Sequence, residues 1–163
     1  AAQGHGWTVY DAAGIRILVM NLLGTVFMEP LASPFETADA ILEKCRGGYD
    51  VALVDFHAEA TSEKLALARY LTGRVSAVWG THTHVATADC RILGGHTGFI
   101  TDLGMVGSAD GILGVKSEAV LHKFLVKTPV RFETEHGNEG ATGALFTVDS
   151  GSGKCISAES VSF

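Results

Sequence analysis

DVALVDFHAEATSEKLALARYLTGRVSAVWG, residues 50–80, is the stretch that decides the fold. A nearly continuous apolar run at 50–56 is followed by an amphipathic pattern at 61–73 and by a second apolar run at 74–80. This order predicts strand, helix, strand, which is a βαβ unit with two parallel strands. Such crossovers are right-handed, so the segments that follow the two strands emerge at the same edge of the sheet. Open α/β sheets bind their ligands at that edge.

The residues before this unit add a hairpin and a helix. The β-rich runs 7–11 and 14–21 are separated by Ala12 and Ala13 with Gly14 next, which predicts a tight hairpin. Ser33, Pro34 and Glu36 occupy the N-cap, N1 and N3 positions of a capping box, which predicts a helix that ends before Arg46, Gly47 and Gly48. The chain therefore opens in a sheet and then crosses to the βαβ unit.

The residues after the unit form shorter patterns. A strand is expected at 97–101, a long ordered loop at 104–114 and a helix at 116–126. Three further segments predict a closing antiparallel meander: 129–135, 143–149 and 155–163. We expect an α/β protein with a mixed sheet, organised as one domain over residues 1–163.

Composition narrows the class of protein. The 163 residues are 47% apolar and carry a net charge of -6, which excludes a disordered tail. The sequence contains no stripe of Lys and Arg of the kind that lines a nucleic-acid groove. It also contains no apolar run that reaches the roughly 18 residues of a membrane span. We expect a cytoplasmic protein whose three cysteines are reduced thiols.

Three histidines follow the two strands of the βαβ unit. His57 comes directly after the first strand, and His82 and His84 come directly after the second. In extended backbone a His-x-His pair points both rings to one side, so we expect the three imidazoles to converge on one metal ion. The alternative is that residues 81–84 form an ordinary polar loop.

Four motifs carry a resemblance to a known family: NLLGTVFMEPLASPF (21–35), DFHAEATSEK (55–64), GTHTHVATAD (80–89) and ITDLGM (100–105). They resemble the YmdB-type metallophosphoesterases, bacterial members of the calcineurin-like superfamily. The resemblance covers nearly the whole chain. It implies a four-layer α/β/β/α sandwich of which this chain is part, and a two-metal centre that hydrolyses phosphodiesters such as cyclic nucleotides.

The resemblance also implies roles for single residues. His57 and His82 would bind one metal ion and His84 the other. In the family the carboxylate and amide ligands and a general-acid histidine come from strands that precede all four of these motifs, so no catalytic residue is assigned. We expect at most one divalent cation, Mn, Fe, Zn or Mg, because three neutral imidazoles cannot offset the repulsion between two adjacent cations.

Four neighbouring residues are expected to support the histidines without binding the metal: Asp55, Glu59, Thr83 and Asp102. The alternatives are that Asp55 or Glu59 binds the metal directly or only adds negative charge at the start of the next helix, and that Asp102 only caps a turn. The predicted function is metal-dependent hydrolysis of a small phosphodiester, with this chain carrying the histidine half of the centre. The alternative is a non-catalytic truncated homologue that binds one metal or none and acts as a folded or assembly module. We further expect either a homo-oligomer or an additional N-terminal segment to cover the apolar surface.

Overall fold

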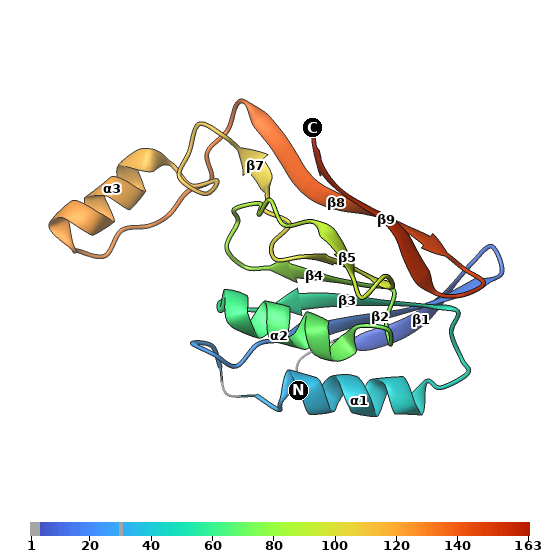
Figure 1. Ribbon diagram of the computed structural model, residues 1–163. Helices are drawn as coiled ribbons and strands as arrows, with labels where there is room; N and C mark the ends of the chain where they lie inside the picture. The colour runs from blue at the N-terminus through green and yellow to red at the C-terminus, as the bar shows by residue number, and fades with distance from the viewer. Residues whose placement is uncertain (1–3, 30) are drawn as a thin grey trace.

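A computed structural model describes residues 4–29 and 31–163, so Pro30 of the 21–35 motif lies outside the described residues. Its elements appear in Figure 1 in the following order: β1 (Trp7–Ala12), β2 (Ile15–Leu23), α1 (Pro34–Lys44), β3 (Val51–His57), α2 (Thr61–Leu71), β4 (Ala77–Thr81), β5 (Arg91–Leu93), β6 (Thr97–Ile100), β7 (Val106–Ser108), α3 (Ser117–Val126), β8 (Glu139–Asp149) and β9 (Lys154–Ser162).

The larger sheet is mixed and has six strands in the order β1-β2-β3-β4-β6-β5. Strands β2, β3, β4 and β6 are parallel, and β1 and β5 add one antiparallel strand at each edge. The predicted hairpin and βαβ unit are confirmed: β1 pairs with β2, and β3 pairs in parallel with β4 across α2. The carboxyl ends of β3 and β4 therefore meet, with His57 opposite Thr81.

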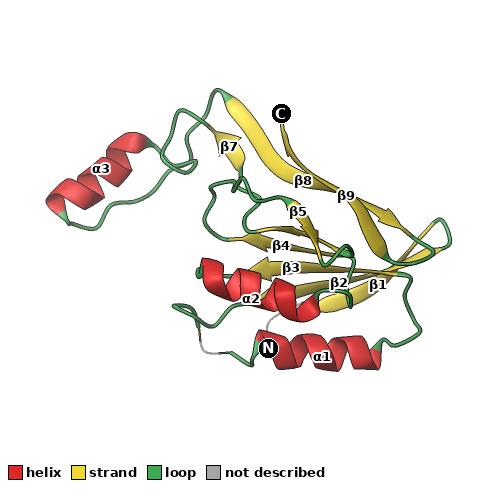
Figure 2. Ribbon diagram, viewed as in Figure 1, coloured by secondary structure: helices red, strands yellow, loops and turns green. Residues whose placement is uncertain are grey.

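Helices α1 and α2 cover one face of this sheet (Figure 2). The core lies between them and the strands, because alternate residues of β3, Ala52, Val54 and Phe56, are buried together with Leu67 and Leu71 of α2. The intervening residues of β3 face the other side of the sheet. None of the described helices has the length and apolar character needed to cross a bilayer.

The other face of the sheet receives the β8–β9 hairpin, which belongs to a three-stranded antiparallel sheet, β7-β8-β9. The two sheets approach closely at Gly98 of β6, where an added Cβ would lie 2.5 Å from Cδ1 of Phe146 and 2.8 Å from Sγ of Cys155. All three cysteines are free thiols, as expected. Helix α3 extends away from both sheets in Figure 1.

Three expectations about the elements are wrong. Residues 129–135 do not form a strand, since only Thr134 makes an isolated bridge, to Val115. The third strand of the antiparallel sheet is instead β7, which lies inside the expected 104–114 loop. Strand β5 has no counterpart among the expected elements. The capping box is absent, because Ser33 makes no side-chain cap and instead accepts hydrogen bonds from Thr37 through its carbonyl.

Candidate functional site

A cavity of about 410 Å³ opens at the carboxyl edge of the large sheet. One wall holds His57, Thr81, His82 and His84, at the ends of β3 and β4. The opposite wall comes from Thr134, which lies between α3 and β8, and from the segment around β7: Gly104, Met105, Val106, Gly107, Leu113 and Gly114. The βαβ topology thus places the three predicted histidines in one cavity, at the edge where the sequence predicted them.

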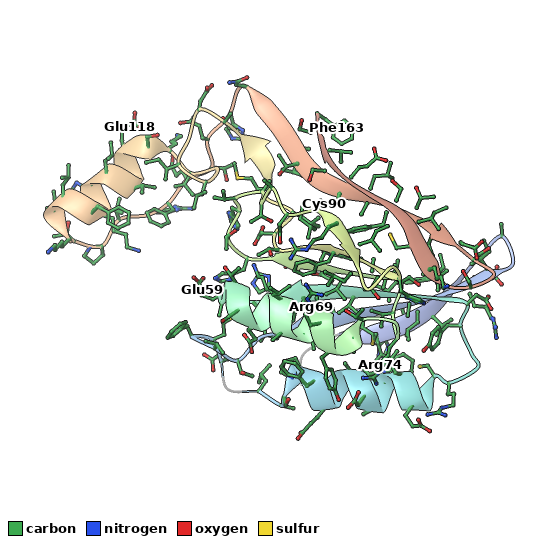
Figure 3. The ribbon with its side chains drawn as sticks, viewed as in Figure 1. Glu59, Arg69, Arg74, Cys90, Glu118 and Phe163 are labelled. Atoms are coloured by element: carbon green, nitrogen blue, oxygen red, sulfur yellow. The ribbon has the colours of Figure 1, made fainter. Side chains whose placement is uncertain are left out.

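The imidazoles of His57 and His82 are in direct contact. Nε2 of His57 lies 3.0 Å from Nδ1 of His82, and the rings meet edge to face with centroids 4.8 Å apart. The outer nitrogens are also engaged: Nδ1 of His57 lies 3.0 Å from Oγ1 of Thr81, and Nε2 of His82 lies 2.8 Å from Oε2 of Glu59. Glu59 precedes α2 at the same edge (Figure 3).

These contacts bear on which ring nitrogens carry a proton. A carboxylate only accepts, so Nε2 of His82 donates to Glu59. If the hydroxyl of Thr81 donates to Asp55, which lies 3.4 Å away, it accepts a hydrogen bond from Nδ1 of His57. In that tautomer of His57 each ring directs a lone pair at the other, an arrangement that a cation between them would satisfy.

The chemistry of this pair suits a metal ion. Burial, and after it the neighbouring His82, lowers the pKa of His57, which favours the neutral form that binds metals. Nitrogens 3.0 Å apart can both reach one cation at a bond length of about 2.1 Å. Hydrogen bonds to the remote ring nitrogens are typical of metal-binding histidines. The pair therefore fits one cation.

His84 does not join the pair. In the described part of the chain no three His, Cys, Asp or Glu side chains form a group that could hold a metal ion, so the expected convergence of three imidazoles on one ion is wrong. The reason is the backbone: His82 and His84 have positive φ angles of 116° and 64°, so the alternation of an extended strand does not apply. His84 still lines the cavity, from a bent loop.

The four expected supporting residues lie around this loop. Asp55 accepts hydrogen bonds from Thr81 and from Nδ2 of Asn21, and Glu59 contacts His82 directly. Asp102 accepts a hydrogen bond from the backbone N–H of Thr83 at 3.0 Å. Their effect on a bound metal stays a prediction.

Two residues near the site were missed by the sequence analysis, Asn21 and Lys64. Asn21 is a polar residue within the apolar strand β2, and its Nδ2 donates a hydrogen bond to Asp55 at 3.0 Å. Lys64 is buried on α2 at helical spacing with Leu67, Ala68 and Leu71, all of them buried. A lysine on the apolar face of a helix is a signal that could have been found.

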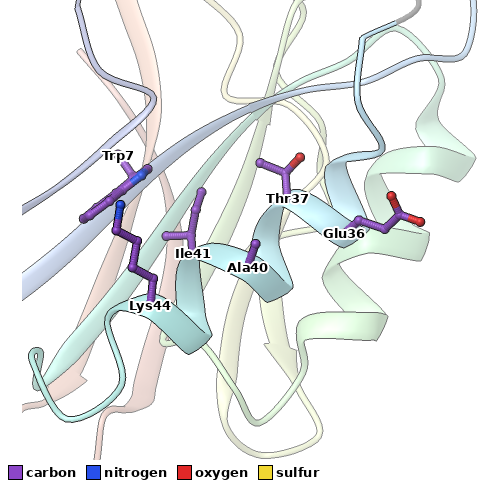
Figure 4. A pocket seen from close by; sticks show the side chains of 6 residues that line it. All are labelled: Trp7, Glu36, Thr37, Ala40, Ile41 and Lys44. Carbon is purple, nitrogen blue, oxygen red and sulfur yellow. The ribbon is translucent and has the colours of Figure 1, made fainter.

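A second hollow, of about 340 Å³, lies on α1 and is shown in Figure 4. Trp7 of β1 stands over it, with Nζ of Lys44 5.1 Å from the ring centroid. Its other lining residues are Glu36, Thr37, Ala40 and Ile41, all on α1. It contains no histidine, and we assign it to the packing of α1 beside β1.

Comparisons with known proteins give a consistent result. Residues 1–161 match the family of YmdB-like proteins. The chain is 44% identical over 158 residues to a 2',3'-cyclic-nucleotide 2'-phosphodiesterase of Bacillus subtilis, covering 97% of this chain and 60% of that protein. It is 35% identical over 161 residues to a putative phosphatase/phosphodiesterase of Mycoplasma pneumoniae, covering 97% of this chain and 57% of the relative.

Solved structures agree with these matches. A hypothetical protein from Thermus thermophilus superposes with a TM-score of 0.91 at 38% identity, covering 98% of this chain and 62% of that one. A phosphatase from Mycoplasma pneumoniae gives a TM-score of 0.90 at 34% identity, covering 98% and 57%. The chain spans about 60% of the length of the curated relatives it matches.

Proposed function

The chain belongs to the family of YmdB-like proteins, and on that basis we propose that it carries the histidine part of a metal-dependent phosphodiesterase. Relatives named as phosphodiesterase or phosphatase support hydrolysis of a phosphoester bond. The proposed substrate is a small phosphodiester such as a cyclic nucleotide. We also propose that the two sheets and their helices belong to a four-layer α/β/β/α sandwich.

The observation that carries the proposal is the facing pair of imidazole nitrogens of His57 and His82, 3.0 Å apart in the cavity. We propose that these two residues hold one divalent cation, Mn, Fe, Zn or Mg, and that His84 serves a second ion in the whole protein. Such ions polarise the phosphoryl oxygens and activate a water molecule when bound. Glu59 and Thr81 keep the rings oriented through their remote nitrogens.

The charge of the chain supports the need for a cation. Its net charge is -6, so a phosphodiester approaching the cavity requires a local positive charge. The described wall residues of the cavity are histidine, threonine, glycine and apolar residues, with no lysine or arginine among them. A metal ion between the histidines would supply that charge.

Metal binding is the first test. We expect Mn²⁺ titrated calorimetrically into the chain to bind, and His57→Ala or His82→Ala to weaken binding at least about tenfold, because each removes one of two facing donors. His122→Ala is the matched control, since His122 lies on α3 and bonds Thr128 instead. Absence of Mn²⁺ binding, or equal affinity in all three variants, would overturn the proposal.

Hydrolysis is the second test. We expect these residues alone to hydrolyse bis(p-nitrophenyl) phosphate with Mn²⁺ more slowly than the Bacillus subtilis relative, because their described part offers no group of three metal-binding side chains. His82→Ala should abolish what turnover remains. Turnover equal to that of the relative would show that the site is completed by another route, such as ligands from a second copy.

A further inference from the structure

Lys64 and Asp102 form an ion pair inside the protein. The side chain of Lys64 is 1% exposed and that of Asp102 is 0% exposed, and Nζ of the lysine lies 2.8 Å from Oδ2 of the aspartate. Removing two charges from water is costly, and apolar residues in place of such a pair are often equally stable or more stable. Stability alone is therefore a weak reason for this pair.

The lysine reaches Asp102 by crossing the strand that leads to the histidines. Its Cδ would lie 2.8 Å from a Cβ added at Gly80, and the carbonyl oxygen of Thr101 would lie at 1.8 Å. Only a residue without a side chain fits at this point of β4. Because Gly80 has no side chain, the side chain of Lys64 can extend from α2 past β4 at a point directly before Thr81 and His82.

Asp102 connects the lysine to both walls of the cavity. One carboxylate oxygen, Oδ2, accepts hydrogen bonds from Lys64 and from the backbone N–H of Thr83 at 3.0 Å. The other, Oδ1, accepts from the backbone N–H of Gly104 at 2.9 Å. Thr83 lies between His82 and His84, and Gly104 begins the opposite wall.

Asp102 is held in its charged form by these donors. Burial by itself would raise the pKa of this carboxyl, but hydrogen bonds from Lys64 and from the amides of Gly104 and Thr83 bring the pKa below its ordinary value. The backbone it anchors is strained, because His82 and His84 both have positive φ. Such conformations persist only where neighbouring groups fix them.

We propose that Lys64 is a positioning residue, which through Asp102 fixes the bent loop that carries His82 and His84 and so sets the placement of the imidazoles. Its link to catalysis rests on the proposed function, but its effect on the loop does not. The ammonium group is buried and bonded to Asp102, so it acts on the loop and not on a substrate.

The adjacent residue on the helix provides a matched control. Glu63 is also buried, in the same turn of α2, but it accepts hydrogen bonds from the backbone N–H groups of Thr25 and Val26. These residues follow β2, on the other side of β3 from the histidine loop. Glu63→Gln therefore disturbs a buried carboxylate of α2 without touching Asp102.

The experiment is amide hydrogen exchange in the metal-free chain, below the unfolding temperature. In Lys64→Met we expect exchange at Thr83 and Gly104 to accelerate about tenfold or more, because their acceptor, the Asp102 carboxylate, loses the ammonium group that holds it. Thr25 and Val26 should keep their protection, because their acceptor, Glu63, makes no contact with Lys64 through its carboxylate in these hydrogen bonds. Glu63→Gln should give the opposite pattern. Equal acceleration at all four amides in Lys64→Met would overturn the proposal, because it would indicate a general loss of stability.

A double variant covers the case in which Lys64→Met does not fold. Lys64→Met with Asp102→Asn removes both buried charges, so the fold should recover. In the wild type the N–H groups of Thr83 and Gly104 donate to different oxygens of Asp102, whereas an asparagine has one side-chain oxygen and can replace only one of these two acceptors. We expect rapid exchange at Thr83 or Gly104 and altered ¹⁵N shifts of the His82 and His84 rings. Wild-type exchange and ring shifts in a stable double variant would refute the proposal.

The two proposals fail separately. If exchange follows the expected pattern but Mn²⁺ does not bind the wild-type chain, the positioning effect stands and the phosphodiesterase proposal falls. If Mn²⁺ binds and Lys64→Met leaves Thr83, Gly104 and the affinity unchanged, the phosphodiesterase proposal stands and Lys64 has no positioning effect.

Discussion

Arg16 and Asp50 show what one exposed ion pair does at the start of a strand. The carboxylate of Asp50, just before β3, accepts hydrogen bonds from the backbone N–H, Nε and Nη2 of Arg16 at 2.8, 3.2 and 2.6 Å. The side-chain hydrogen bond and then the backbone one lower the pKa of Asp50 from 3.8 to about 2. The pair joins β2 to the residue that precedes β3.

Replacing Arg16 by Gln should therefore remove a stabilising contribution that the wild type has above pH 3.8, so the variant should lose less stability than the wild type as pH falls from 3.8 toward 2. A carboxyl with a lowered folded pKa stabilises the fold above its unfolded value of 3.8, and this effect is lost as pH falls through about 2. In Arg16→Gln we expect the Asp50 pKa, followed by carboxyl NMR titration, to return toward 3.8. Arg46→Gln, which breaks a pair with Glu43, should leave it near 2. An unchanged Asp50 pKa in Arg16→Gln would contradict this account.

Gly80 offers a second test at a single residue. Gly80→Ala should destabilise the protein by about 2 kcal/mol or more, since the backbone at Thr101 and the buried Lys64 leave no room for a methyl group. Gly143→Ala is the control on β8, where the added Cβ would meet Val161 at an ordinary 3.7 Å. Urea unfolding should show a large loss of unfolding free energy for Gly80→Ala and little or none for Gly143→Ala. Equal midpoints would contradict the steric argument.

The sequence predicts single residues well where topology places them. His57 and His82 lie together because parallel strands end at one edge, which follows from the βαβ pattern. The position of His84 depends on two positive φ angles that no alternation rule contains. Lys64 belongs to an ordinary amphipathic helix in the sequence, and its partner is 38 residues away, so only the fold pairs them.

Among the elements, those with a local signature were predictable. The strands and helices of the 50–80 region and the β8–β9 hairpin have clear periodicity. Strands β5 and β7 have three residues each, too few for any pattern, and they exist because β6 and β8 offer them edges. Residues 129–135 alternate like a strand but have no neighbouring strand to pair with beyond one bridge at Thr134.

The packing of the β8–β9 hairpin against the large sheet gives a prediction about the contact between two elements. Phe146 reaches Gly98 of β6, whereas its neighbour Leu145 is 57% exposed. Phe146→Ala should cost about 2 to 3 kcal/mol of unfolding free energy, because it leaves a gap between the sheets, and Leu145→Ala less than about 1. Thermal or urea unfolding measures the loss of unfolding free energy in both variants. A larger loss for Leu145→Ala would show that the hairpin is seated differently.

At the scale of the whole molecule, apolar surface gathers on α3. Of its residues Val120 is buried, while Leu121, Phe124, Leu125 and Val126 are exposed, Phe124 by 74% and Leu125 by 80%. The helix extends away from both sheets (Figure 1), so neither sheet covers these side chains. Contiguous apolar surface of this kind favours association.

We therefore expect the chain to self-associate at micromolar concentration, with α3 of one copy covering α3 of another. Light scattering should report a mass of at least twice 17.1 kDa. Phe124→Ser with Leu125→Ser should shift it toward 17.1 kDa without unfolding the sheets, because both side chains are exposed in the single copy. Tyr10→Ser, which alters an exposed aromatic residue on β1, should leave the mass unchanged. A wild-type monomer with cooperative unfolding would show that exposed α3 residues do not drive association, because the free energy of covering them does not exceed the cost of bringing two copies together.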